Sequence, residues 1–214
     1  MKRAPSATVR RDIIRACKRL DAKGLLAGAE GNVSARLAAN RIAVTPAGRC
    51  KADLSVRELV ETTLDGRPVS GVTTPSSELP MHLAIYRARP DVGAVVHAHP
   101  VAATGFAVAQ KTIPQAALAE AAGVLGPVPL APYRAPGSAG LALVVAKALK
   151  GANVALLANH GAVAVGPTID VALQRMESLE QAARIVVAAR ILGGERNLKT
   201  ADLRALQRAW LAGA

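Results

Sequence analysis

Two of the four histidines in this 214-residue chain, His97 and His99, are separated by one residue at the end of the apolar run AVVHAHP. Side chains at positions i and i+2 of a β-strand point to the same face of the sheet. Two neutral imidazoles side by side can chelate one divalent ion such as Zn²⁺. The same spacing also suits two packed or hydrogen-bonded histidines, so the pair alone leaves both interpretations open.

A third histidine favours the metal interpretation. His160 ends another apolar run, in LLANHGAVAVG, and the following Gly161 permits a tight turn and a close backbone approach. Open α/β sheets form their sites at the C-terminal ends of strands, where these three histidines are predicted to lie. Three histidines with one open position form a ligand set of catalytic zinc. The fourth, His82, falls inside a predicted helix, and we place it outside the site as a packed or hydrogen-bonded residue.

The segment PSSELP supplies a candidate acid–base residue, Glu78, directly after Ser76 and Ser77. A carboxylate beside a bound divalent ion can take a proton from a carbon or hydroxyl that the metal has made acidic. A glutamate at the start of a helix also interacts favourably with the helix dipole, which is the alternative interpretation. The two serines, with their hydroxyls and backbone N–H groups at a predicted helix N-terminus, indicate an anion site.

Two glycine turns can add to that anion site. EGNVS contains Gly31 and Asn32, and TPAG contains Gly48. Each turn alone is ordinary turn chemistry, but the chain carries 27 Lys and Arg against 15 Asp and Glu, a net charge of +12. Together these features predict a small phosphorylated ligand. We expect no nucleic-acid partner, because the basic residues are spread along the chain and only 2% of residues are aromatic.

The elements that must position these residues follow from apolar periodicity and from turn residues. Ser77 is predicted to cap the second helix, with Pro80 in its first turn and its end before Pro90. SVRELVETTLDGRPVSG predicts a short helix, a strand and an Asp-Gly turn, and GPVPLAPY an edge strand or an irregular segment. The remaining helices and strands are expected at residues 6–23, 78–88, 141–149, 168–193 and 199–212, and at 42–45, 92–99, 155–158 and 162–165.

Composition predicts one folded α/β domain over residues 1–214, because 51% of the residues are hydrophobic. No apolar run reaches the roughly 18 residues that would span a membrane, so no membrane partner is expected. The basic N-terminus is predicted to be helical rather than a secretion signal. Cys17 and Cys50 form no close motif, which favours a reduced, cytoplasmic protein.

The motifs GNVSAR, TPAG, PSSELPMHLAIYRARPDVGAVVHAHP and LLANHGAVAVG resemble, in this order and over about residues 8–190, the class II aldolase/adducin family. The resemblance implies a central mixed, largely antiparallel β-sheet flanked by helices, assembled as a homotetramer. It implies reversible aldol cleavage of a small sugar phosphate, as in the fuculose-1-phosphate aldolases, through a metal-stabilised enediolate.

The resemblance also assigns roles to residues. One divalent ion per chain, normally Zn²⁺ with Mn²⁺ as an alternative, would be held by His97, His99 and His160. Glu78 would contact the metal in the empty site and swing away to act as acid and base. The substrate phosphate would lie against Gly31, Asn32, Gly48, Ser76 and Ser77.

The chain departs from the fuculose-phosphate aldolases on the side of the second substrate. Ala47 replaces a hydroxyl residue of the phosphate loop, and Leu118 appears where those enzymes have a tyrosine that helps to protonate the aldehyde. No tyrosine follows Tyr133, although those enzymes use one in a C-terminal tail. A metal-dependent decarboxylase of a hydroxy or keto acid therefore stays open. So does a non-enzymatic, adducin-like scaffold, although the three histidines argue against it.

Overall fold

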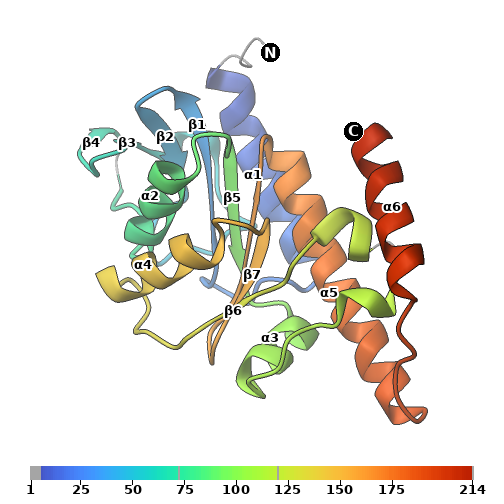
Figure 1. Cartoon of the computed structure of the whole chain (residues 1–214). Helices are drawn as coiled ribbons and strands as arrows, with labels where there is room; N and C mark the ends of the chain where they lie inside the picture. The colour runs from blue at the N-terminus through green and yellow to red at the C-terminus, as the bar shows by residue number, and fades with distance from the viewer. Residues whose placement is uncertain (1–5, 72, 120, 214) are drawn as a thin grey trace.

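A computed structural model of the chain describes residues 6–71, 73–119 and 121–213. The strands of this part form one sheet in the order β4-β3-β2-β1-β5-β8-β7-β6 (Figure 1). Neighbouring strands are antiparallel except β6 and β7, which are parallel, so the predicted mixed, largely antiparallel sheet is confirmed. The strands are β1 Asn32–Ala38, β2 Arg41–Val44, β3 Val60–Thr63, β4 Pro68–Ser70, β5 Ala94–Ala98, β6 Leu130–Ala131, β7 Val154–Leu157 and β8 Gly161–Gly166.

Helices cover both faces of the sheet. On one face α1, α3 and α5 pack over the strands, and α2 and α4 lie on the other (Figure 1). The C-terminal helix α6 contacts η3 rather than the sheet. The helices are α1 Ser6–Ala22, α2 Leu79–Ala88, α3 Val101–Val108, α4 Ala139–Ala148, α5 Ile169–Ile191 and α6 Thr200–Gly213, with the short turns η1 Val56–Glu58, η2 Gln115–Ala117 and η3 Ala121–Leu125. No described helix is long and apolar enough to span a bilayer.

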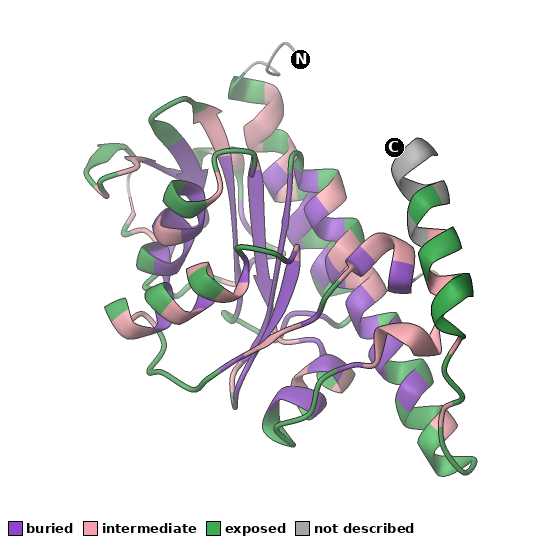
Figure 2. Ribbon diagram, in the orientation of Figure 1, coloured by how far each residue is buried: buried purple, intermediate pink, exposed green. Residues whose placement is uncertain are grey.

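The central strands are buried on both faces, which explains why their sequences are continuous apolar runs (Figure 2). Along β5, Val96 and Ala98 join the apolar cluster under α1, α3 and α5, whereas Val95 joins the cluster under α2 and α4. Because side chains alternate along a strand, His97 points to the α2 and α4 face. It is fully buried there, and the chain must therefore give it polar partners.

Two expectations about local structure were wrong. Ser77 is not the cap of α2: the cap position is Glu78, and the N–H of Leu79 is already satisfied by the carbonyl of Ser76 in a tight turn. Strand β5 begins at Ala94 and ends at Ala98, so His99 lies just beyond it. The expected proline in the first turn of α2 and the end of that helix before Pro90 are confirmed, and β6 is an edge strand.

Candidate metal and acid–base site

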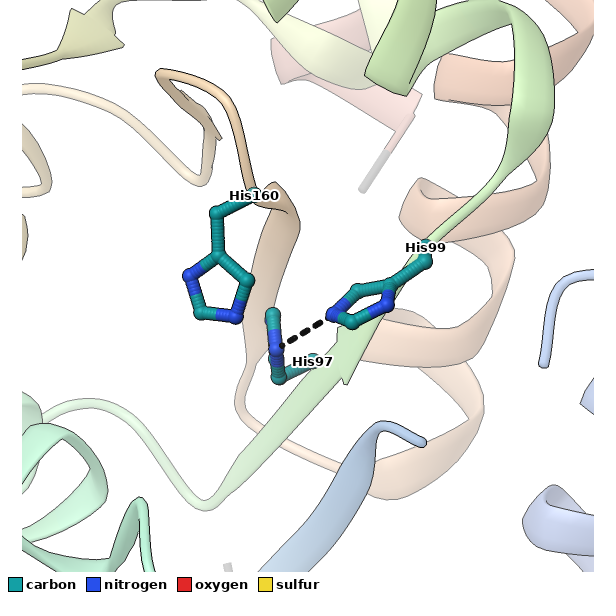
Figure 3. A group of neighbouring side chains, drawn as sticks. All are labelled: His97, His99 and His160. Carbon is teal, nitrogen blue, oxygen red and sulfur yellow. Dashed lines mark hydrogen bonds between the residues drawn. The ribbon is translucent and has the colours of Figure 1, made fainter. Parts of the chain in front are cut away.

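Three imidazoles converge at one end of the central strands (Figure 3). His97 belongs to β5, His99 follows β5 directly, and His160 lies in the turn between β7 and β8. One ring nitrogen from each lies within 4.8 Å of the others, and the ring centroids are 4.8–5.1 Å apart. Of the four histidines, these are the three that the sequence predicted as ligands.

The sheet register brings them together. Strands β5 and β8 are antiparallel neighbours in which Ala98 pairs with Ala162, so the end of β5 lies beside the turn that carries His160. Gly161 makes the approach possible, because a Cβ at this position would lie 2.5 Å from the Cδ2 atom of His99. The close backbone approach that Gly161 predicted is therefore an approach to the ring of His99, another candidate ligand.

Hydrogen bonds fix which nitrogens are free. His97 donates its Nδ1–H to the carbonyl of Ala162 over 2.9 Å, and His99 donates its Nδ1–H to the carboxylate of Glu30 over 2.8 Å. Each of these acceptors has no proton to give, so both imidazoles must be protonated at Nδ1 and, when neutral, carry a lone pair on Nε2. Such second contacts orient metal-binding histidines in proteins.

The two free nitrogens face each other. The Nε2 atoms of His97 and His99 lie 3.2 Å apart (dashed in Figure 3). Two lone pairs at this distance repel each other unless a proton or a cation lies between them. Two nitrogens bound tetrahedrally to one Zn²⁺ at about 2.0–2.1 Å would be separated by roughly 3.4 Å, which is close to the observed spacing. The geometry of the pair therefore fits a shared divalent ion.

The carboxylate of Glu78 faces the same point from the start of α2. Its Oε2 lies 2.9 Å from Nε2 of His97 and accepts a hydrogen bond from the amide of Asn32 over 3.0 Å. Its Oε1 lies 3.4 Å from Nε2 of His160 and, among the described residues, is buried without a hydrogen-bond partner. A buried carboxylate oxygen without a partner, beside imidazole nitrogens, is relieved by a cation.

The local charges set the protonation states. Burial alone would raise the pKa of Glu78, but the nearby His97 charge and hydrogen bond, followed by the amide of Asn32 and by His160, hold it well below its ordinary value. Burial lowers the pKa of His99 and lowers the pKa of His160 to about 4, with the charge of His97 as the second cause in each case. At neutral pH the site thus offers neutral imidazoles at His99 and His160 and an ionised carboxylate at Glu78, the forms that bind Zn²⁺ or Mn²⁺.

The predicted anion-binding serines, Ser76 and Ser77, lie in or next to a segment that is hydrogen-bonded to the TPAG turn through its backbone. The N–H of Ala47 donates to the carbonyl of Thr74, and the N–H of Ser76 donates to the carbonyl of Thr45. The backbone N–H of Ser76 is therefore occupied, contrary to its expected use for an anion. The hydroxyl of Ser76 accepts from the N–H of Glu78 and keeps its own proton to donate, and Ser77 is exposed.

The predicted anion-binding turns differ in how closely they pack. Gly31 has a φ of 66°, and a Cβ there would lie 2.8 Å from the carbonyl oxygen of His97. Gly48 has a φ of 64° and open space around it. Asn32 is buried and directs its amide to Glu78. That these residues bind an anion stays a prediction.

Sequence reasoning missed residues that support the site. His82 is outside the three-histidine group, as expected, yet it connects to the site, because its Nδ1 lies 2.6 Å from the hydroxyl of Ser34 and its Nε2 contacts the amide oxygen of Asn32. Burial, followed by the charge of His97, lowers the pKa of His82 to about 3. Glu30, which orients His99, was also missed. The available signal was the pair Asn32 and Ser34, two polar residues on the same face of strand β1.

Leu118, the residue that replaces the family tyrosine, follows η2 at its C-terminal end and packs against the core under α5. It lines a cavity of about 690 Å³ together with Leu25, Glu180 and Arg184. The backbone carbonyl of Leu25 accepts a hydrogen bond from the N–H of His99. The cavity wall is thus directly joined to a candidate metal ligand.

Comparison with known proteins agrees with the fold. The family described as "Class II Aldolase and Adducin N-terminal domain" matches residues 11–187, and the chain belongs to this family. It is 33% identical to the 3-oxo-tetronate 4-phosphate decarboxylase of Pectobacterium atrosepticum, over 84% of this chain and 83% of that protein. It is 34% identical to the L-fuculose phosphate aldolase of Escherichia coli, over 82% and 80%. A solved L-fuculose 1-phosphate aldolase superposes with a TM-score of 0.90 at 30% identity, covering 95% of this chain and 96% of that one.

Proposed function

We propose that this protein is a metal-dependent lyase that cleaves a small phosphorylated hydroxy-carbonyl compound, and that the reaction is a reversible aldol cleavage of a sugar phosphate. One observation carries the proposal: the Nε2 atoms of His97 and His99 face each other at 3.2 Å with the carboxylate of Glu78 beside them. This donor set fits one divalent ion, for which we propose Zn²⁺, with Mn²⁺ as the alternative.

The residues divide the chemistry between them. A divalent ion held by the three histidines would supply positive charge for the oxygens on which negative charge develops. The ionised carboxylate of Glu78 would accept a proton from the substrate and return it. Gly31, Gly48, Ser76 and Ser77 would hold the phosphate, and binding at this remote group positions the reacting carbon. Asn32 would join them through the second N–H of its amide, because the first is directed at the carboxylate of Glu78.

Decarboxylation is the second candidate, and Leu118 favours it. A tyrosine that protonates an aldehyde is not needed when CO₂ is the leaving group, so its replacement by leucine is compatible with that reaction. The similar Pectobacterium protein is a 3-oxo-tetronate 4-phosphate decarboxylase. The same metal would serve, because both reactions leave negative charge beside a carbonyl group. In decarboxylation the carboxylate would leave as CO₂ without loss of a proton to a base, and the protonated form of Glu78 would deliver a proton to the carbon that CO₂ has left.

Product analysis separates the two reactions. Protein loaded with Zn²⁺ or Mn²⁺ is incubated with L-fuculose 1-phosphate and, separately, with 3-oxo-tetronate 4-phosphate. We expect release of an aldehyde and a three-carbon ketone phosphate from the first compound, and loss of turnover after chelation of the metal. CO₂ release from the second compound without aldehyde from the first would favour the decarboxylase. Turnover that survives complete metal removal would contradict both.

We also propose that the chain assembles as a homotetramer. Large apolar side chains on α3, α4 and the end of α5 are exposed in the single chain: Val101 at 72%, Leu143 at 71%, Ile191 at 81% and Leu192 at 87%. Contacts between subunits on both sides of the sheet would cover these side chains. Light scattering at micromolar concentration should give about four times the 21.9 kDa mass of the chain. A mass near that of one chain would refute the assembly.

A further inference from the structure

Behind Glu78, a row of buried polar side chains runs between α2 and β1. Tyr86 Oη lies 2.9 Å from Ser34 Oγ, and Ser34 Oγ lies 2.6 Å from Nδ1 of His82. Nε2 of His82 contacts Oδ1 of Asn32, and Nδ2 of Asn32 lies 3.0 Å from Oε2 of Glu78. The exposed fractions of Tyr86, Ser34, His82 and Asn32 are 1%, 0%, 0% and 3%, so solvent does not compete for these bonds.

The carboxylate of Glu78 at one end of this row sets the direction of every hydrogen bond in it. A carboxylate can only accept, so Asn32 must turn its NH₂ group to Glu78 and its oxygen to His82. His82 must then carry its proton on Nε2, which leaves Nδ1 to accept from the hydroxyl of Ser34. The oxygen of Ser34 in turn accepts from the phenol of Tyr86. One tautomer of His82 satisfies all four bonds, and a reversed amide of Asn32 would place an oxygen against the carboxylate.

The row connects the two elements that carry the site. Asn32 and Ser34 are two residues apart on β1, and His82 and Tyr86 are four residues apart on α2, so each pair lies on one face of its element. Asn32 pairs across the sheet with His97 of β5. Glu78 lies at the cap of α2, immediately before the helix that carries the other half of the row. The row therefore fixes the start of α2 relative to the histidine cluster.

We propose that His82 is a positioning residue of the reaction: through its Nε2–H it holds the amide of Asn32 with the NH₂ group toward Glu78, and so orients the carboxylate that moves the proton. The inference rests on the proposed function, because a positioned base matters only if Glu78 is a base. The hydrogen bond from Asn32 holds the carboxylate through Oε2. Its Oε1 has no hydrogen-bond partner among the described residues and is therefore available to exchange a proton with a substrate. Ser34 and Tyr86 act one and two steps further back by fixing the tautomer.

Two substitutions at one position separate orientation from packing. His82→Met fills a similar volume without a donor, whereas His82→Gln places an N–H donor near the former Nε2. Thr62→Val is the matched control, because Thr62 is fully buried on β3 with a hydroxyl that has no hydrogen-bond partner in the described chain. Each variant of the whole chain is loaded with Zn²⁺ before the assay. The substrate is L-fuculose 1-phosphate or 3-oxo-tetronate 4-phosphate, whichever the wild type converts.

We expect His82→Met to lower kcat by about 10–100-fold with KM and zinc content nearly unchanged, the usual scale for loss of a group that orients a site residue. His82→Gln should recover most of the loss, and Thr62→Val should stay within about 2-fold of wild type. Equal losses in His82→Met and His82→Gln, or no loss in either, would overturn the positioning role. Loss of zinc in His82→Met would overturn it too, because the role would then be structural.

A spectroscopic measurement tests the same inference without a substrate. In the ¹⁵N spectrum of the zinc-loaded protein, His82 should show a proton on Nε2 and a bare Nδ1, and Ser34→Ala or Tyr86→Phe should shift the Nδ1 resonance. A proton on Nδ1 would overturn the proposed row. Absence of turnover by wild type would instead reject the proposed function, so the two failures are distinguishable.

Discussion

Replacement of His97 by alanine is expected to remove the bound metal and the activity together. His97 is the most buried of the three candidate ligands, it contacts both His99 and Glu78, and its Nδ1 is already used by Ala162. Without its Nε2 the site keeps two imidazoles from loop positions, which is too few for a tight zinc site. Elemental analysis should give about one divalent ion per wild-type chain and close to none in His97→Ala.

Thermal unfolding gives an independent readout of the same site. An ion that binds only the folded state at about 100 times its Kd adds about 2.7 kcal/mol to stability, which for a chain of this size raises Tm by roughly 5–10 °C. Zinc should raise the Tm of the wild type and leave that of His97→Ala unchanged. His82→Gln is the matched histidine control and should keep the zinc response. If His97→Ala still binds one ion and its Tm still rises with zinc, the metal must be bound by other residues.

Local sequence patterns predicted the parts of the site whose geometry is local. The i, i+2 spacing of His97 and His99 predicted their proximity, although β5 ends at Ala98 and His99 follows it directly. The continuous apolar run before them reflects burial on both faces of the sheet. The approach of His160 to the pair depends on a long-range register between β5 and β8, but Gly161 and the end of an apolar run gave enough signal. The helices α1, α2, α4 and α5 were predicted from the periodicity of apolar residues and from turn residues.

The supporting residues were not predictable in the same way. The contact between His82 and Asn32 joins residues 50 positions apart, and it depends on the rotation of α2 relative to β1. Ser77 looked like a cap, but a turn from Ser76 had already satisfied the first N–H of the helix. Both cases involve a polar group whose partner is chosen by tertiary packing, which no local pattern encodes. The orientation of His99 by Glu30, 69 positions away, belongs to the same class.

Replacement of Glu78 by glutamine is expected to separate metal binding from turnover. Glutamine keeps an oxygen that can accept from the amide of Asn32, and the three histidines are untouched, so zinc content should stay near one per chain. An amide cannot take the proton that the reaction removes, and a general base contributes about 10²–10⁴-fold to rate. We therefore expect kcat to fall by at least about 100-fold while the zinc-dependent rise in Tm remains.

The matched control is Glu61→Gln, which neutralises a buried glutamate paired with Arg10 and Arg41 on β3, away from the histidines. Its kcat should stay near that of wild type. That result would show that neutralising a buried carboxylate does not by itself lower kcat. Full activity in Glu78→Gln would reject Glu78 as the base. Joint loss of zinc and activity would show instead that the carboxylate serves mainly as a fourth ligand. The short distance from its Oε2 to Nε2 of His97 makes that a real alternative, and only the pairing of metal content with rate decides between the two roles.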